Sequence, residues 1–387
     1  MKPVTTHESQ LASQSEVRGD LMHPVHGGGL IAVSRMTGLD LEDLLDFSVN
    51  VNPLGPPGCV QEIFSRSMHL LTQYPEPCYE DLKQAISNAT GVPTDWVAIG
   101  NGSTELIYLL PDLLDRGKQV LIVSPCFSEY ERAFQPTDCA VKHFILDSSN
   151  GFSLPIDKFL FQLQQFPDLG GIVIGHPNNP TGTLLAEESF RTLSAFCERR
   201  GIFLFIDETF IDFSAPESSF LKYTSLCPHL VLIRSMTKFY SLPGLRLGYA
   251  IMNPERVKTL EAHQPPWSVN ALAQAMGPAL LTSAGFAEAT CQYVQREKEF
   301  LCKNLSEAPS VEIFPSQANF ILFRLREGDD TEAKHFFEAL LHQGIVLRNC
   351  GNFKGLNPGF FRLAIRSRID NQLLVSRIHE FFQKNGV

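Results

Sequence analysis

The stretch LVLIRSMTKFYSLPGLRLGYAIM, residues 230–252, decides the fold and carries the most informative chemistry of this chain. Its two ends, LVLIRS and LGYAIM, are rich in branched apolar side chains and too short for helices, so they predict two buried strands. Lys238, a glycine-containing turn and Arg246 lie between them. A lysine at a strand end is usually a solvated surface group, but its neighbours here favour a ligand site.

Four earlier runs have the same character: WVAIG (96–100), QVLIVS (119–124), GIVIG (171–175) and IFLFID (202–207). They alternate with longer helix-like stretches between residues 94 and 252, which predicts an α/β domain with a large, mainly parallel sheet. Polar residues follow the strand ends at 101–104, 178–181, 207–208 and 235–238. Ligand sites of open α/β sheets form at that edge, so we expect these side chains to meet.

The pattern changes after about residue 285. Strand-like runs VEIFPSQANFILFRL, IVLRN and FFRLAIR stand among helix-like segments, two of them near 331–343 and 369–383, and predict a small α+β domain. We therefore expect a polar N-terminal extension at 1–22, a segment at 23–45 that packs on the small domain, a large domain at 46–285 and the small domain at 286–387.

Composition narrows the class of protein. The formal net charge is −10, which argues against non-specific electrostatic binding to nucleic acid or to an anionic membrane. No run of about 18 apolar residues predicts a membrane span. The N-terminus lacks the apolar core of a secretion signal, so we expect a cytoplasmic protein. The nine cysteines form no C-x-x-C pair, and we predict no metal site.

Lys238 and Asp207 are the residues that point to a particular cofactor. An amine that condenses with an aldehyde is best held in a partly desolvated pocket, where its neutral form becomes accessible. Asp207 ends the hydrophobic run IFLFID, where a carboxylate needs a partner, and the pyridinium nitrogen of pyridoxal 5′-phosphate (PLP) is suitable. A helix cap or a buried ion pair is the alternative for Asp207. Glu208 beside it points to the other face.

Three further segments offer groups for a phosphorylated ring. Ser235 and Arg246 provide a hydroxyl and a fixed positive charge for the phosphate near Lys238. GNGSTELI (100–107) runs from a strand into a helix, whose first N–H groups with Ser103 and Thr104 form a phosphate cradle, although capping alone also explains these hydroxyls. In HPNNPTG (176–182), Asn179 can bond the ring's phenolic oxygen, although the segment by itself is only a turn signal.

Together, NPTG at 179–182, Asp207, Lys238 and Arg246 resemble the fold-type I aminotransferase superfamily of PLP enzymes, over nearly the whole chain from about residue 26. The resemblance implies a fold-type I PLP-transferase in which Lys238 forms the Schiff base, Asp207 binds the pyridine nitrogen and Asn179 binds the ring hydroxyl. It also implies that Phe127 stacks on the cofactor ring. The implied protein is a homodimer in which Tyr74 reaches the neighbouring subunit's cofactor. The implied site for the cofactor phosphate consists of Gly102, Ser103, Thr104, Ser235 and Arg246. Many relatives carry Tyr where this chain has Phe210.

Within the superfamily, four segments look most like the threonine-phosphate decarboxylases of cobalamin biosynthesis, with histidinol-phosphate aminotransferases next. They are HGG (26–28), DFSVNVNPLG (46–55), GIVLRNCGNFKGL (344–356) and FRLAIR (361–366). This chain departs from the decarboxylases at Gly29, where they usually place Asn.

The substrate expected from this likeness is a small, doubly anionic amino-acid phosphate. Arg348 and Arg362 offer bidentate forks for a carboxylate and a phosphate, and His26 and Asn52 add donors. We expect decarboxylation of L-threonine O-3-phosphate. The alternatives are L-serine O-phosphate as the substrate, transamination of the histidinol-phosphate type, and a non-catalytic PLP-binding regulator, for which no DNA-binding appendage is visible.

Overall fold

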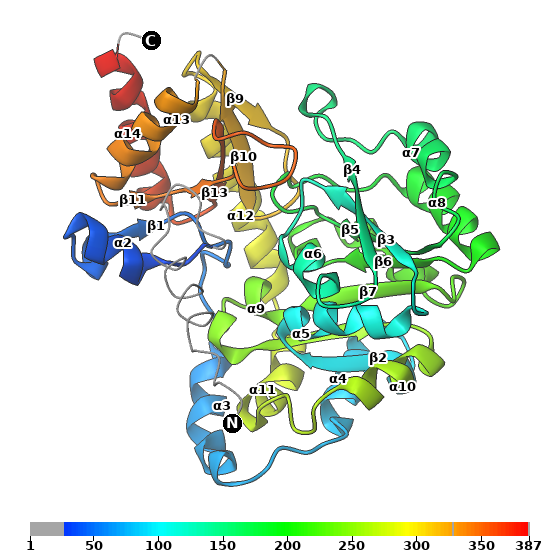
Figure 1. Cartoon of the computed structure of the whole chain (residues 1–387). Coiled ribbons are helices and arrows are strands. Elements are labelled where there is room, and N and C mark those ends of the chain that lie inside the picture. Colours follow the sequence, from blue (N-terminus) through cyan, green and yellow to red (C-terminus); the bar gives the residue numbers. More distant parts are fainter. Residues whose placement is uncertain (1–26, 327–328, 386–387) are drawn as a thin grey trace, which may run out of the picture.

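The computed structural model describes residues 27–326 and 329–385 (Figure 1). The predicted polar extension at 1–22 lies outside the described residues. The segment that follows, with α2 (Leu30–Thr37) and β1 (Leu45–Asp46), lies against the C-terminal part of the chain, because β1 pairs in parallel with β11 (Ile345–Val346). Val33, Leu44 and Phe47 belong to the same apolar cluster as the C-terminal helices.

A seven-stranded sheet forms the centre of the large domain. Its order is β2-β8-β7-β6-β5-β3-β4, with parallel pairing from β7 to β4 and antiparallel pairing of β8 with both neighbours. Its strands are β2 (Val97–Asn101), β3 (Gln119–Ser124), β4 (Ala140–Ile145), β5 (Leu169–Gly175), β6 (Phe203–Asp207), β7 (Leu230–Ser235) and β8 (Leu247–Ile251). The predicted α/β class with a mainly parallel sheet is confirmed.

Both faces of this sheet are covered, which explains why its strands are apolar without alternation. Ile172 and Ile174 of β5 belong to the cluster on one face, while Val173 belongs to the cluster on the other. The helices of this part of the chain are α3 (Cys59–Ser67), α4 (Glu80–Thr90), α5 (Gly102–Leu109), α6 (Glu129–Phe134), α7 (Ile156–Leu163), α8 (Glu187–Arg200), α9 (Met236–Phe239), α10 (Pro254–His263) and α11 (Ala271–Leu281).

Strand β4 is the one strand of this sheet that we did not predict from the sequence. It lies at the edge, next to β3, and its residues alternate between more and less exposed positions. Lys142 and His143 interrupt its apolar character. An edge strand needs no continuous apolar run, so the criterion that found the buried strands does not find this one.

A four-stranded antiparallel sheet forms the small domain, in the order β12-β13-β10-β9. Its strands are β9 (Val311–Phe314), β10 (Phe320–Leu325), β12 (Arg348–Asn349) and β13 (Phe360–Ala364), and its helices are α12 (Phe286–Leu305), α13 (Asp330–Leu341) and α14 (Arg368–Asn385). Figure 1 shows these helices and strands beside the large sheet, with the N-terminal α2 and β1 against them.

Gly248 brings the middle of β8 close to the start of α5. A Cβ at this position would lie 2.4 Å from the Ser103 backbone nitrogen and 2.9 Å from the Arg234 carbonyl oxygen. Backbone atoms of a helix start and of a central strand cannot move aside as a flexible side chain can. The close approach therefore requires glycine.

We expect Gly248→Ala to lower the free energy of unfolding by about 1–3 kcal/mol, because the added methyl group displaces backbone on two elements. Urea unfolding measures this loss. Gly244→Ala is the matched control, since nothing lies within 4 Å of a Cβ at that position. Equal stabilities of the two variants would contradict the packing argument.

Candidate functional site

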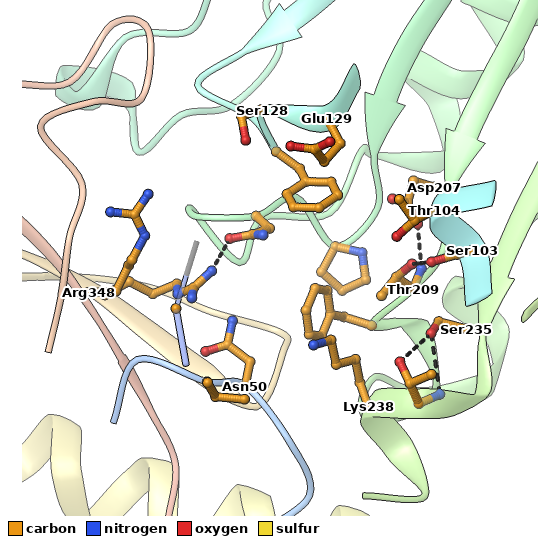
Figure 2. A pocket seen from close by; sticks show the side chains of 18 of the residues that line it. Asn50, Ser103, Thr104, Ser128, Glu129, Asp207, Thr209, Ser235, Lys238 and Arg348 are labelled. Atoms are coloured by element: carbon orange, nitrogen blue, oxygen red, sulfur yellow. Dashed lines mark hydrogen bonds between the residues drawn. The ribbon is translucent and has the colours of Figure 1, made fainter. Parts of the chain in front are cut away.

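Five of the large sheet's connections lead into one cavity of about 370 Å³, which lies at the carboxyl ends of the parallel strands. Figure 2 shows Lys238 between two groups of labelled side chains, with Asn50 and Arg348 on one side and Ser103, Asp207 and Thr209 on the other. The cavity wall includes most of the predicted site residues: Ser103, Thr104, Phe127, Asn179, Asp207, Ser235, Lys238, Arg246, Arg348 and Arg362.

Lys238 is positioned by the short helix α9, which follows β7 directly. The Ser235 hydroxyl caps this helix by accepting from the Thr237 backbone N–H (3.3 Å). Burial lowers the pKa of the Lys238 amine to about 8, and the positive charges of Arg362 and Arg246 act in the same direction. The neutral amine that condensation with an aldehyde requires is therefore far more populated near neutral pH than in an ordinary exposed lysine.

Asp207 ends β6 with a buried carboxylate that is held by two donors. The Thr209 backbone N–H donates to Oδ1 (2.9 Å), and the Tyr130 hydroxyl donates to Oδ2 (2.6 Å). Burial raises the pKa of the Asp207 carboxyl, and hydrogen bonds from the Thr209 side chain, the Tyr130 hydroxyl and the Thr209 backbone oppose the rise. Among the residues that the structure describes, no cationic side chain forms an ion pair with Asp207. A protonated ring nitrogen fits this carboxylate.

Glu208, the next residue, has a separate structural role. Its buried carboxylate forms an ion pair with Arg234 (2.8 Å) and accepts from the Phe220 backbone N–H (2.8 Å). Glu208 is not part of the cavity wall. Adjacent carboxylates at the end of one strand thus serve opposite sides of the sheet, as the strand period predicts.

The N-terminus of α5 forms one end of the cavity and has the donors of an anion site. Ser103 and Thr104 line the cavity there, together with Arg246. Gly102 has a φ of +77°, and a Cβ on it would lie 2.4 Å from Arg246 Nη2, so the guanidinium packs directly on the helix start. Backbone N–H groups, hydroxyls and a guanidinium in one place fit a phosphate group.

Aromatic side chains enclose the space between this end and the arginines. Phe127 and Phe210 line the cavity, and Phe127 packs edge-on against Tyr130, with 5.8 Å between ring centroids. Phe210 packs edge-on against Phe320 (5.0 Å between centroids). The hydroxyl that many relatives have at position 210 is therefore replaced by an apolar contact with the small domain.

Arg348 and Arg362 project from neighbouring antiparallel strands, β12 and β13, where they are directly paired in register. Both are buried, and burial lowers the pKa of each guanidinium, that of Arg362 to about 10. The Arg348 guanidinium lies over the Phe353 ring, 4.9 Å from its centroid, and donates to Asn352 Oδ1 (2.9 Å).

Neutral oxygen atoms hold Arg362. It donates to the Ser48 carbonyl (2.7 Å) and to Asn179 Oδ1. With the Asn50 amide turned so that its oxygen faces the guanidinium, that oxygen lies 3.2 Å from Nε and 3.0 Å from Nη1 and accepts from both. No carboxylate among the described residues forms an ion pair with Arg362. Like charges directly opposite each other are unfavourable, so two adjacent buried guanidiniums favour binding of an anion.

The structure does not bring every predicted residue into the cavity. The Asn52 amide is used within the protein, donating to the Phe239 carbonyl and to Thr290 Oγ1, both at 2.8 Å, and accepting from the Leu54 N–H (3.0 Å). Asn52 does not line the cavity and its amide is used within the protein, so these bonds do not support the substrate contact, which stays a prediction. Its neighbour Asn50 lines the cavity instead. His26 lies outside the described residues.

Tyr74 does not reach the cavity of its own chain. Its side chain is 80% exposed and packs against Trp267, with 4.8 Å between ring centroids. The role in a neighbouring subunit, expected from the family resemblance, stays a prediction.

Several cavity residues were missed in the sequence. Ser48 and Asn50 lie in DFSVNVNPLG, a segment that supports the resemblance, and Tyr130 lies three residues after Phe127, but none of these side chains was assigned a role. Thr209 follows Asp207 by two residues and donates to Ser103 Oγ through its hydroxyl (3.4 Å). Their contacts join segments far apart in sequence, which spacing alone does not reveal.

Two classes of feature are absent from the part of the chain that the structure describes. No group of three or more His, Cys, Asp or Glu side chains is placed to hold a metal ion. Within the same residues, no helix combines the length and the apolar character needed to cross a bilayer.

Comparisons with known proteins agree with this geometry. The family model for aminotransferase class I and II matches residues 42–378. The threonine-phosphate decarboxylase of Salmonella typhimurium is 34% identical over 360 residues, which cover 92% of this chain and 96% of that protein.

Solved structures of two different enzymes are similar to this chain. The histidinol-phosphate aminotransferase of Clostridium acetobutylicum has a TM-score of 0.82 and 30% identity, covering 88% of this chain and all (100%) of that one. The L-threonine-O-3-phosphate decarboxylase of Porphyromonas gingivalis has a TM-score of 0.76 and 25% identity, covering 87% and 99%. The backbone fold therefore does not distinguish the two reactions.

The lowered pKa of Lys238 predicts how the cofactor-free protein reacts with PLP. Only the neutral amine attacks an aldehyde, so the rate should rise with pH and level off above a pKa of about 8. Stopped-flow absorbance of the bound cofactor measures this rate. Lys238→Ala is the control and should form no such product. A rate that rises up to about pH 10, as for an ordinary exposed lysine, would contradict the burial argument.

Proposed function

The chain belongs to the aminotransferase class I and II family, and we propose that it is a PLP-dependent decarboxylase of L-threonine O-3-phosphate that serves cobalamin biosynthesis. The observation that carries this proposal is the register pair of Arg348 and Arg362 in the wall of a cavity that also contains Lys238 and Asp207. A substrate with both a carboxylate and a phosphate offers one anionic group to each arginine. Burial deprives the two guanidiniums of water. The anionic groups of such a ligand compensate for this loss and offset the repulsion between the two positive charges.

The cavity also has the groups needed to hold PLP. Lys238 supplies the amine, Asp207 the carboxylate for the ring nitrogen, and the start of α5 with Arg246 the phosphate site. Asn179 would bond the ring hydroxyl, and Phe127 would cover one face of the ring. Bound PLP supplies an electron sink for the bond that breaks at the substrate's Cα.

The orientation of the substrate in the cavity determines which bond to its Cα breaks. Loss of carbon dioxide requires the Cα–carboxylate bond to stand perpendicular to the cofactor ring. Arginines that fix the substrate's two anionic groups also fix the rotation about Cα. The carboxylate leaves as carbon dioxide, Cα gains a proton, and the product is 1-aminopropan-2-ol O-phosphate. Lys238 Nζ, in the cavity and with a lowered pKa, is suited to carry that proton.

Apolar side chains support decarboxylation by excluding water. Phe127, Phe210 and Phe353 line the cavity beside the charged groups. A water-poor site strengthens the interaction of Asp207 and the arginines with their ligands. It also favours release of a neutral molecule from a buried carboxylate.

We also propose a cytoplasmic homodimer in which Tyr74 completes the cofactor site of the neighbouring subunit. The exposed position of Tyr74 supports this arrangement, as do the exposed apolar residues Phe64, Met68 and Leu71 on the preceding segment. A net charge of −10 argues against nucleic acid as a partner.

A histidinol-phosphate aminotransferase is the second candidate, because its solved relative is as similar in fold as the decarboxylase. L-Serine O-phosphate is an alternative substrate for decarboxylation, since it has the same two anionic groups. A PLP-binding regulator without turnover is the remote third alternative. The products distinguish these candidates.

Incubation with L-threonine O-3-phosphate should release carbon dioxide and 1-aminopropan-2-ol O-phosphate, both measurable by mass spectrometry. L-Serine O-phosphate in a parallel assay would give ethanolamine phosphate. Lys238→Ala, the control, should release neither product. Histidinol phosphate is tested in a third assay. Its conversion to the ketone with formation of pyridoxamine phosphate, or a keto acid in place of carbon dioxide from an amino-acid phosphate, would favour the aminotransferase, and no turnover of any of the three substrates would favour the regulator.

Arg348→Met should raise KM for the amino-acid phosphate roughly ten- to hundredfold, because it removes a charge-assisted hydrogen bond to an anionic group. The apparent affinity for PLP should stay unchanged. Arg324→Met is a matched control on the same small-domain sheet, since Arg324 pairs with Glu312 and does not line the cavity. Equal KM changes in the two variants would show that Arg348 has no specific role in binding.

A further inference from the structure

We propose that Tyr130 is a positioning residue for the cofactor: its hydroxyl holds the Asp207 carboxylate ionised and oriented toward the ring nitrogen of PLP. This inference rests on the proposed function and assigns a role to a residue that the sequence motifs left without one. It acts through Asp207, so its effect should appear first in cofactor binding and in the pH dependence of that binding.

The geometry leaves Asp207 little freedom. The two protein donors bind different oxygens of the carboxylate, the Tyr130 hydroxyl at Oδ2 and the Thr209 N–H at Oδ1. Tyr130 and Asp207 are both buried, and both line the cavity. Thr209 contacts the carboxylate through both its side chain and its backbone N–H, and the N–H remains in any variant. The Tyr130 bond comes from one hydroxyl, so a single substitution removes it completely.

Tyr130 is itself firmly placed. It lies in α6, directly after the loop that carries Phe127, and the two rings pack edge-on. One residue therefore contacts both predicted partners of the cofactor ring, the stacking Phe127 and the carboxylate of Asp207. A displacement of Tyr130 would disturb both contacts together.

The charges favour donation from Tyr130 to Asp207 over the reverse. Burial and the nearby carboxylate raise the pKa of the Tyr130 phenol well above its usual value, so the phenol keeps its proton. Burial raises the pKa of Asp207, and the hydrogen bond from Tyr130 lowers it. Without this bond the carboxylate becomes protonated at a higher pH, and a neutral carboxyl group holds a protonated ring nitrogen less strongly.

The test is Tyr130→Phe, which keeps the ring and removes only the hydroxyl. The dissociation constant for PLP is measured by titrating the cofactor-free protein and following the cofactor's absorbance, from acidic to neutral pH. A lost hydrogen bond to a buried charged group predicts binding about tenfold weaker. It also predicts that affinity falls at a higher pH than in the unaltered protein.

Tyr223→Phe is the matched control. Its hydroxyl also donates to a carboxylate, that of Glu187, but it does not line the cavity. Its PLP affinity should equal that of the unaltered protein. In an Asp207→Asn background, Tyr130→Phe should have no further effect, since the group through which it acts has lost its charge.

Two results would overturn the inference: a PLP affinity and pH dependence for Tyr130→Phe within about twofold of the unaltered protein, or an equal loss with and without Asp207→Asn. If Tyr130→Phe does not fold, a ring-fluorinated tyrosine at position 130 keeps the hydroxyl and makes it a stronger donor. Affinity should then be retained at lower pH, and an unchanged pH dependence would count against the inference.

The inference and the proposed function fail in distinguishable ways. If the unaltered protein binds PLP but releases no carbon dioxide from threonine phosphate, the substrate proposal fails and the role of Tyr130 is still measurable. If carbon dioxide is released and Tyr130→Phe binds PLP as the unaltered protein does, only the inference about Tyr130 fails.

Discussion

The buried carboxylate of Asp207, held by hydrogen bonds and without an ion pair among the described side chains, is the group around which the cavity is arranged. Removing a charge from water is unfavourable unless a partner compensates. Here the protein compensates only in part, through Tyr130 and Thr209. The proposed partner, a cationic ring nitrogen, would supply the remaining interaction, and cofactor binding would then stabilise this site.

On the other side of the cavity the buried charges are positive, and they too need a partner of opposite charge. Arg348 and Arg362 lie side by side on the small-domain sheet, and Arg362 is held only by neutral oxygens among the described residues. Lys238 lies between these arginines and the phosphate cradle, and the charges of Arg362 and Arg246 help to lower its pKa. Positive charge gathered in this way prepares the site for anions and favours the neutral form of the amine.

Much of the fold followed from the sequence because buried parallel strands need apolar residues at every position. The six runs that we identified correspond to β2, β3, β5, β6, β7 and β8, whereas the half-exposed edge strand β4 was missed. The cofactor residues lie directly after those strands, so their order along the chain predicted the site. The sequence could not show which asparagine of DFSVNVNPLG faces the cavity, Asn50 or Asn52, because this depends on the conformation of the folded loop.

The sequence by itself determined the sheet, the reactive lysine and the carboxylate at the end of β6, because apolar runs and the residues that end them are local properties of the chain. Only the tertiary structure decided that Tyr130 bonds Asp207, that Arg348 stands opposite Arg362 and that Asn50 rather than Asn52 faces the cavity. Each of these depends on contacts between segments far apart in sequence. Their geometry is fixed only when these segments have folded against one another.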